Sequence, residues 1–166
     1  MNMFHPGETW NDTNGVAINA HGGGILFYEG TYWWFGEHKI AGEEGNRSHV
    51  GVHVYASENL LEWRDEGIAL AMDDSPGSQI PSGCVLERPK VIFNPASGKF
   101  VMWFHLEPKG TGYAGALSGV STDKKSLLSP PRNDHFPTVR RHNRACRNSF
   151  TEPTGVDLKS RNRCWM

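Results

Sequence analysis

The sequence lacks long hydrophobic runs, has few cysteines and carries almost no net charge. No apolar stretch approaches the roughly 18 residues that a membrane-spanning helix needs, and the mean hydropathy is −0.53, so we expect no membrane partner. Residues 1–6 contain neither a basic nor an apolar region of the kind that begins a signal peptide, which leaves the compartment unassigned. A net charge of −1 over 166 residues gives no general reason to expect a nucleic acid as partner.

The cysteines and histidines show no pattern that is typical of a metal site. Cys84, Cys146 and Cys164 are an odd and widely spaced set, so they form neither a disulfide framework nor a zinc knuckle. The eight histidines are many for this length, but they show no HExxH or comparable spacing. We therefore expect no metal and no cofactor, with a metal site assembled from histidines of separate strands as the alternative.

The near-zero net charge conceals a break in the chain. Residues 1–123 carry 7 Lys and Arg against 15 Asp and Glu, whereas residues 124–166 carry 10 against 3. The second part also loses the aromatic alternation of the first. A basic arm that binds nucleic acid is one interpretation, but no nucleic-acid-binding motif accompanies it. We favour an irregular or non-native basic tail at 124–166.

The first 123 residues are organised as strands and turns. Residues 25–28 and 31–36 are two apolar and aromatic runs on either side of Glu29-Gly30, which indicates a β-hairpin. Residues 49–56 alternate valines onto one face, and residues 67–70 form a short fourth strand. No segment shows a sustained helical period of apolar residues. The sequence therefore predicts an all-β protein.

The same order of elements then recurs. Residues 91–93, 94–98 and 99–105 repeat the strand, turn and aromatic strand of the first unit. Serial four-stranded units are typical of a β-propeller, so we predict a partial propeller over residues 1–123, with blade one at about 16–72 and blade two at about 80–123. A β-sandwich is the alternative. Because propellers close with about 4–8 blades, we expect part of a longer propeller or an assembly of copies, and the oligomeric state is left open.

Polar residues lie where the inner strand of each predicted blade begins. His21 stands before three glycines, which allow close approach of backbone or ligand; a P-loop is excluded because no Gly-Lys-Ser/Thr and helix follow. Glu87 stands before the second inner strand, and Glu37 follows the first aromatic strand. Trp34 is a candidate platform for sugar stacking. The structural alternatives are a hydrogen-bonding role for His21, an edge ion pair for Glu87, a solvated strand end for Glu37 and packing between blades for Trp34.

Four segments, in this order, carry a resemblance to a known family. They are NAHGGGIL at 19–26, YWWFGEHK at 32–39, YASENLLEW at 55–63 and ERPKVIFN at 87–94. Together they resemble glycoside hydrolase family 43, and more narrowly its galactan-acting branch of exo-β-1,3-galactanases and galactosidases. The resemblance covers roughly residues 10–123. It implies a five-bladed propeller with the active site on its axis and inverting hydrolysis by two separated carboxylates.

The resemblance also implies roles for particular residues. Glu87 matches a carboxylate of the catalytic site, and Glu37 matches a second glutamate that contacts the sugar. Most of the family has a base Asp just before the first inner strand, where this sequence has Ala20-His21-Gly22; the galactan-acting branch shares this loss. The family's general acid belongs to a later blade, and after about Asp123 this sequence departs from the family pattern.

We therefore predict a chain that resembles a glycoside hydrolase acting on β-galactan or related plant polysaccharide side chains, truncated and inactive alone. Glu87 is the predicted catalytic residue, and His21, Glu37 and Trp34 are predicted to bind an oligo- or polysaccharide. The alternative is a non-catalytic carbohydrate-binding propeller fragment. A third interpretation is an interaction protein that uses the basic tail.

Overall fold

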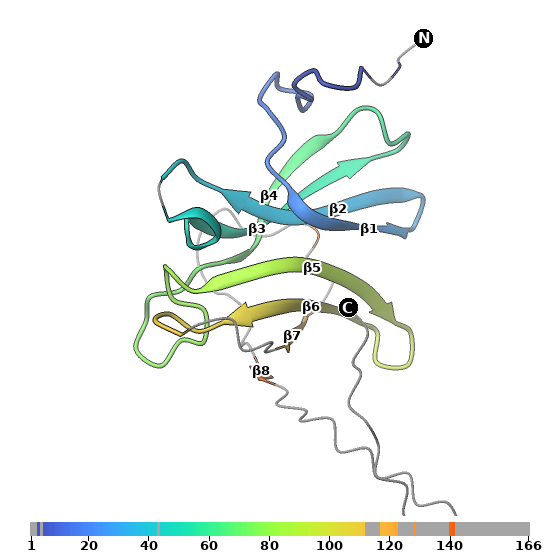
Figure 1. The fold of residues 1–166 in the computed structure, drawn as a ribbon. Helices are drawn as coiled ribbons and strands as arrows, with labels where there is room; N and C mark the ends of the chain where they lie inside the picture. The colour runs from blue at the N-terminus through green and yellow to red at the C-terminus, as the bar shows by residue number, and fades with distance from the viewer. Residues whose placement is uncertain are drawn as a thin grey trace, which may run out of the picture.

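The chain forms two antiparallel sheets of four strands each (Figure 1). The computed structural model describes Met3, residues 5–42, 44–111 and 117–122, Leu128 and Arg140–Arg141. The first sheet contains β1 (His21–Tyr28), β2 (Thr31–Lys39), β3 (His49–Ser57) and β4 (Arg64–Ala71), with a 3₁₀ turn, η1 (Gly45–Arg47), before β3. The second contains β5 (Val85–Asn94), β6 (Lys99–Glu107), β7 (Leu117–Thr122) and β8 (Arg140–Arg141). The prediction of an all-β protein is confirmed.

The hairpin predicted around Glu29-Gly30 is present. Tyr28 pairs with Thr31, and both turn residues have positive φ, 49° at Glu29 and 80° at Gly30. A two-residue turn with positive φ at both positions matches the right-handed twist of the flanking strands. The alternation of the two runs then places Leu26 and Tyr28 toward the second sheet.

The internal repeat predicted from the sequence extends to the irregularities of the inner strands. In β1 the register shifts between His21 and Gly24, and His21 pairs with Glu37 on β2. In β5 it shifts between Glu87 and Lys90, and Glu87 pairs with His105 on β6. Each inner strand therefore has a polar residue directly before its bulge, and that residue pairs with a polar residue of the neighbouring strand. His21 and Glu87, predicted to stand before the inner strands, lie within them, because β1 begins at His21 and β5 at Val85. Bulges of this kind re-aim side chains at functional sites.

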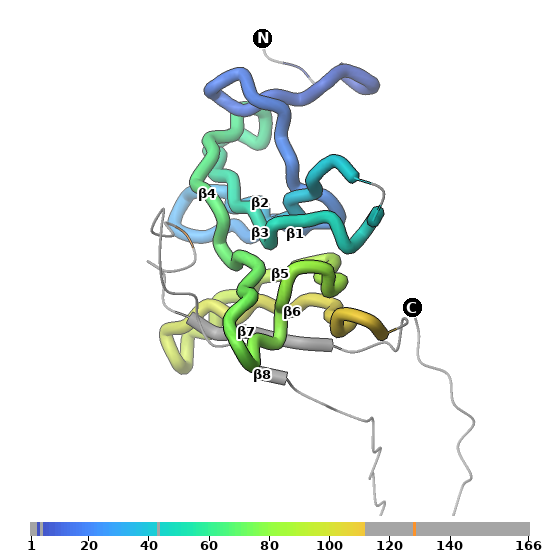
Figure 2. Tube along the Cα trace, turned by 90° about the vertical axis from the view of Figure 1, so that its left-hand side faces the viewer, coloured from blue at the N-terminus to red at the C-terminus, as the bar shows by residue number. Residues whose placement is uncertain are grey.

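The main core lies between the two sheets. Phe35, Val54 and Leu70 from the first sheet pack with Leu86 and others from the second, all essentially inaccessible to solvent. The inner strands β1 and β5 contact each other, and Figures 1 and 2 show the sheets as two stacked layers, with the N-terminal segment on the far side of the first sheet. This stacking brings the beginnings of the two inner strands close together.

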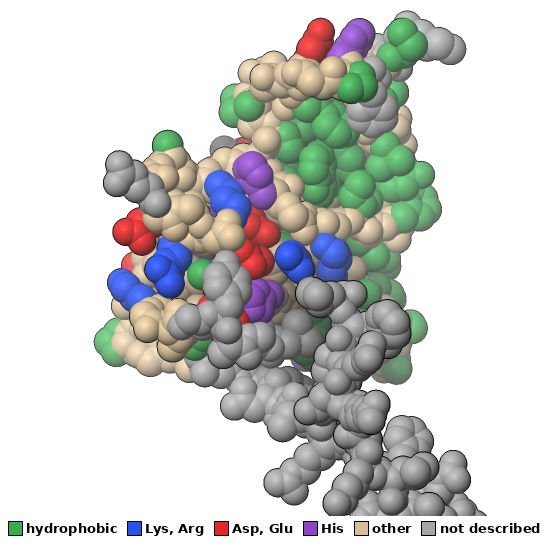
Figure 3. Space-filling model, in the orientation of Figure 1, with side chains coloured by type: hydrophobic (Ala, Val, Ile, Leu, Met, Phe, Trp, Pro, Cys, Tyr) green, Lys and Arg blue, Asp and Glu red, His purple; other side chains and the backbone are tan. Residues whose placement is uncertain are grey.

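A second, smaller cluster covers the other face of the first sheet. It consists of Ala20, Tyr55 and Trp63, with Trp10 and Trp34 packed against them. Hydrophobic side chains remain exposed on this sheet, including Ile25 at 53 % and Phe27 at 59 %. Figure 3 shows hydrophobic side chains covering one part of the surface and charged and histidine side chains gathered on an adjoining part.

Most of the predicted tail, residues 124–166, lies outside the described residues, so its irregularity stays a prediction. Two parts of it are described. Leu128 is 1 % exposed and belongs to the main core cluster. Arg140 and Arg141 pair with Gly119 and Ser118 and add the edge strand β8 to the second sheet. Within the described residues, no helix is both long and apolar enough to cross a membrane.

Candidate active site

The side chain of Glu37, near the end of β2, joins the first sheet to β5 of the second. Its side chain is buried, with Lys39 Nζ 2.8 Å from Oε2. The backbone N–H of Arg88 donates a hydrogen bond of 2.9 Å to Glu37 Oε1. Both bonds are charge-assisted, which makes them stronger than bonds between neutral groups. Glu37 is therefore held in one position at the boundary between the sheets.

The bulge in β5 makes this connection possible. Arg88 has a φ of 55°, in the left-handed region that side chains other than glycine seldom adopt. This conformation accompanies the register shift after Glu87, and the Arg88 N–H points to the first sheet rather than to β6. Because Glu87 directly precedes Arg88, the link also fixes Glu87 near Glu37.

Glu87 lies in a chain of three ionisable side chains on the second sheet. His105 Nδ1 is 3.2 Å from Glu87 Oε2, and its Nε2 is 2.7 Å from Glu107 Oε1. Glu87 is 8 % exposed and Glu107 1 %. Carboxylates only accept hydrogen bonds, so both contacts are bonds when the imidazole carries a proton on each nitrogen. In that state Glu87 is an acceptor, held by His105 rather than free to rotate.

The glycine run at the beginning of β1 makes room for this site. A side chain at Gly22 or Gly23 would collide with Glu37 Oε1 or with the backbone carbonyl of Phe35. Lys90 from the second sheet donates from Nζ to the carbonyl oxygens of Gly22 and Gly23, at 3.1 and 2.7 Å. Burial lowers the pKa of Lys90. The close approach expected at these glycines is thus made by the protein's own groups.

A buried histidine lies close enough to the two glutamates for their charges to act on it. His49, on β3, is 5 % exposed, and its Nε2 donates 3.2 Å to the carbonyl oxygen of Cys84. Burial lowers the pKa of His49, and the nearby charges of Glu37 and Glu87 oppose that effect. His49 is therefore a neutral imidazole at neutral pH, adjacent to the negative charge of the site.

The other two predicted site residues, His21 and Trp34, line a hollow whose lining does not include the two carboxylates. His21 is exposed and is the register partner of Glu37. Trp34 packs against Trp10 and Trp63, with ring centroids 5.6 and 5.2 Å apart. His21, Trp34 and Trp10 together line an open hollow of about 280 Å³. Of the four predicted residues, the structure thus links Glu37 with Glu87 and brings His21 together with Trp34.

The arrangement resembles known structures in both sequence and fold. A GH43 β-1,3-galactosidase solved with galactodeoxynojirimycin is 47 % identical and matches 81 % of this chain with a TM-score of 0.71. An exo-β-1,3-galactanase from Phanerochaete chrysosporium, solved with β-1,3-galactotriose, is 32 % identical over 85 % of the chain, with a TM-score of 0.67. An exo-β-1,3-galactanase from Clostridium thermocellum is 31 % identical over 81 %, with a TM-score of 0.62. The chain belongs to glycoside hydrolase family 43.

This family 43 chain spans about a third of the length of these relatives, 36 %, 30 % and 26 % respectively. No model of a protein family matches it, and no curated protein does. The family resemblance stated from the four sequence segments is confirmed. So is the fold, a partial five-bladed propeller rather than a sandwich, with the two sheets as blades.

Glu107 and the contacts of His105 are not among the residues predicted from the sequence. The internal repeat contained a signal for His105, because the pair His21–Glu37 in the first blade corresponds to Glu87–His105 in the second. Glu107 had no such signal, since it stands at the end of an aromatic strand where a solvated carboxylate is common. Among the described residues, no group of three or more His, Cys, Asp or Glu side chains is placed to hold a metal ion.

Proposed function

We propose that this family 43 chain supplies the galactose-binding part of a galactan-acting glycosidase site. The observation that carries the proposal is the hydrogen bond from the Arg88 N–H to Glu37, which joins the backbone beside buried Glu87 to a buried carboxylate of the neighbouring blade. Buried, hydrogen-bonded carboxylates are suited to accept hydrogen bonds from the hydroxyl groups of a sugar. The 47 % identity to a β-1,3-galactosidase supports galactose as that sugar.

The proposed roles of the two glutamates differ. Glu87 Oε2 lies 3.2 Å from His105 Nδ1 and accepts a hydrogen bond there when that nitrogen carries a proton. We assign Glu87 to accept hydrogen bonds from a sugar hydroxyl or a water molecule within the catalytic site. Glu37 already accepts from Arg88 and Lys39, and we assign it to orient the sugar with its remaining lone pairs. Exposed His21 extends the site along the axis, and the hollow at Trp34 offers a neighbouring aromatic surface.

Hydrolysis requires a further group. An inverting glycosidase uses a general acid and a base on opposite sides of the bond, with their carboxyl groups about 6.5–9.5 Å apart. Glu37 accepts hydrogen bonds from protein donors, and the family resemblance implies that the proton donor belongs to a later blade. We therefore propose that this chain, on its own, binds galactose-containing oligosaccharides without hydrolysing them.

Calorimetric titration tests the binding site. Galactose and β-1,3-galactobiose are titrated into the wild-type chain and into the Glu37→Gln, Glu87→Gln and Glu58→Gln variants. We expect at least tenfold weaker binding for the first two variants, because a charged acceptor contributes about 1.5–3 kcal/mol. Glu58 is exposed in a turn, and its variant serves as the matched control. Equal affinity in all four proteins, or no binding to the wild type, would contradict the proposal.

A further inference from the structure

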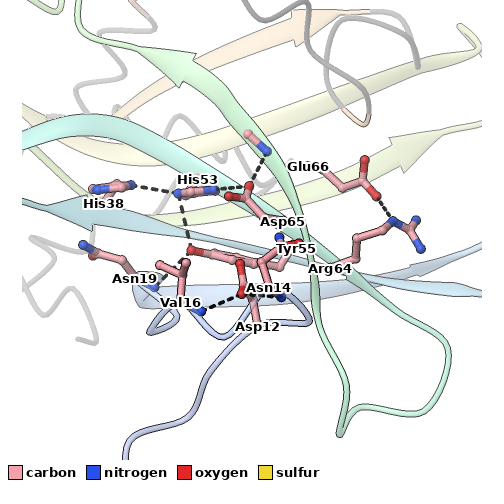
Figure 4. A network of polar contacts seen from close by, with 11 residues as sticks. Asp12, Asn14, Val16, Asn19, His38, His53, Tyr55, Arg64, Asp65 and Glu66 are labelled. Atoms are coloured by element: carbon pink, nitrogen blue, oxygen red, sulfur yellow. Dashed lines mark hydrogen bonds and ion pairs between the residues drawn. The ribbon is translucent and has the colours of Figure 1, made fainter.

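A line of polar side chains crosses the face of the first blade that points away from the second (Figure 4). His38 on β2 faces His53 on β3, with 2.8 Å between their Nδ1 atoms and the two rings nearly parallel at 6°. His53 Nε2 lies 2.6 Å from Oδ1 of Asp65 on β4. His38 is thus the last ring of a chain that runs Asp65, His53, His38.

The chemistry of the acceptor fixes where the protons lie. The same Asp65 oxygen accepts a 2.7 Å hydrogen bond from the Gly67 N–H, so the carboxylate acts as an acceptor on both sides. His53 therefore carries its proton on Nε2. In the neutral ring this leaves a lone pair on His53 Nδ1, and the 2.8 Å contact requires His38 to donate from Nδ1. The neutral His38 then has no proton on Nε2.

The surroundings favour the neutral pair. Burial and the neighbouring His53 lower the pKa of His38, while Asp65 raises it and His21 on β1 lowers it further. Burial also raises the pKa of Tyr55, whose hydroxyl lies 3.5 Å from His53 Nδ1 and accepts from the Asn19 N–H. Asp12, in the loop before β1, is close enough to His53 for the two charges to interact.

Addition of one proton to the His38–His53 pair reverses the hydrogen-bonding role of His38 Nε2, whichever ring carries the charge. If the charge is on His38, both nitrogens of that ring carry protons. If it is on His53, the Nδ1–H of His53 donates to His38, and the neutral His38 must carry its proton on Nε2. In both cases His38 Nε2 changes from an acceptor to a donor.

We propose that Asp65, acting through His53, fixes His38 as a hydrogen-bond acceptor for a ligand hydroxyl at the edge of the sugar site, and that one added proton turns it into a donor. Its place in the fold supports this role. His38 follows Glu37 at the end of β2 but faces the other side of the strand, the side of Trp34. His21, which lines the hollow at Trp34, is near enough to affect the His38 charge. The Nε2 atom lies on the side of the ring away from His53 (Figure 4). The hydroxyl part of the inference rests on the proposed function; the proton arrangement does not.

Long-range ¹H–¹⁵N correlation spectra of the ¹⁵N-histidine-labelled chain test the proton arrangement. At pH 7.5 we expect His53 protonated on Nε2 and His38 protonated on Nδ1. Asp65→Asn retains an oxygen acceptor, so it preserves both tautomers but moves the His38 titration to lower pH. Asp65→Ala removes the acceptor and gives a mixture of tautomers, while the control Glu66→Gln changes neither property. A proton on His38 Nε2 in the wild type at pH 7.5 would overturn the relay.

Titration with β-1,3-galactobiose at pH 7.5 tests the hydroxyl contact. We expect His38→Leu to bind about three- to tenfold more weakly than the wild type, as the loss of one neutral hydrogen bond predicts, and Glu66→Gln to bind equally well. Unchanged affinity of His38→Leu, with the wild type binding, would overturn the contact while the proposed function stands. If the wild type does not bind at all, the proposed function and the contact both fail, and the spectra still decide the relay.

Discussion

Arg88 has the least common backbone conformation of any described strand residue. The other non-glycine residues with positive φ, Glu29 and Leu60, lie in a turn and a loop, whereas Arg88 lies within β5. Strained backbone of this kind gathers at functional sites, and here it directs the N–H that holds Glu37. The sequence could name Glu37 and Glu87 as candidates by their position and family motif. It could not show the Arg88 conformation, which depends on a register shift between two strands.

Two substitutions at this position separate strain from hydrogen bonding. Arg88→Gly removes the steric cost of positive φ and keeps the N–H, so we expect the free energy of unfolding to stay within about 1 kcal/mol of the wild type. Arg88→Val introduces a β-branched side chain at the same φ, and we expect a loss of about 1–3 kcal/mol. Urea denaturation measures both. Equal stability of the two variants would mean that φ at this residue is not positive in solution.

The burial of His49 predicts how the free energy of unfolding depends on pH. Burial lowers the His49 pKa below 6.5, the value of an unfolded chain, so near pH 6 the unfolded state binds more protons. The free energy of unfolding therefore decreases as the pH falls below about 6.5, by at most about 1.4 kcal/mol per pH unit for each such proton. The decrease ends once the pH is below the lowered pKa of the folded state.

Denaturation at pH 7.5, 6.5 and 5.5 measures this slope. We expect His49→Gln to have a smaller slope than the wild type. The slope that remains is due to His38, whose pKa is also lowered. His5→Gln, at an exposed position of the N-terminal segment, should retain the full slope. A slope in His49→Gln that equals that of the wild type would show that His49 is not the buried neutral group.

At the scale of strands, the alternation of side chains determined most of what the sequence could predict. Both hairpins, the all-β fold and the repeat of the unit follow from apolar and aromatic residues at every second position. The bulges do not follow, because a single inserted residue leaves the composition of a strand unchanged. Trp34 and Glu37 are close in the sequence of β2, but they do not share a face. Residues an odd number of positions apart on a strand point to opposite sides of the sheet.

Gly36, on β2, tests how closely the loop before β1 approaches the sheet. A side chain at Gly36 would collide with the backbone of Ala20, whereas one at Gly42 would meet the hydroxyl of Ser48, the end of a flexible side chain. Neither glycine has positive φ. We expect Gly36→Ala to lose about 1–3 kcal/mol of unfolding free energy and Gly42→Ala to lose much less. Comparable losses in urea denaturation would contradict the close approach.

At the scale of the whole molecule, two blades carry one connected set of carboxylates. The chain spans about a third of its relatives, so the fold class and the family could be established from residues 10–123, while the hydrolytic partner groups could not. Hydrophobic side chains such as Ile25 and Phe27 stay exposed on the first blade. The comparison confirms the family.

The absence of hydrolysis by this chain is a prediction at the same scale. Removal of a general acid lowers a rate typically by about 10²–10⁴-fold, and the loss of positioning lowers it further. We therefore expect no release of galactose from β-1,3-galactan or aryl galactosides above that in buffer. Turnover by the wild type that disappears in Glu87→Gln would instead show a complete catalytic site.

A crystal structure of the chain with β-1,3-galactobiose tests the central claim most directly, because it locates the sugar relative to both blades. The account predicts a terminal galactose whose hydroxyl groups lie within hydrogen-bonding distance of the carboxylates of Glu37 and Glu87, next to the Arg88 backbone. A sugar bound instead in the hollow between Trp10 and Trp34, out of reach of both glutamates, would contradict it.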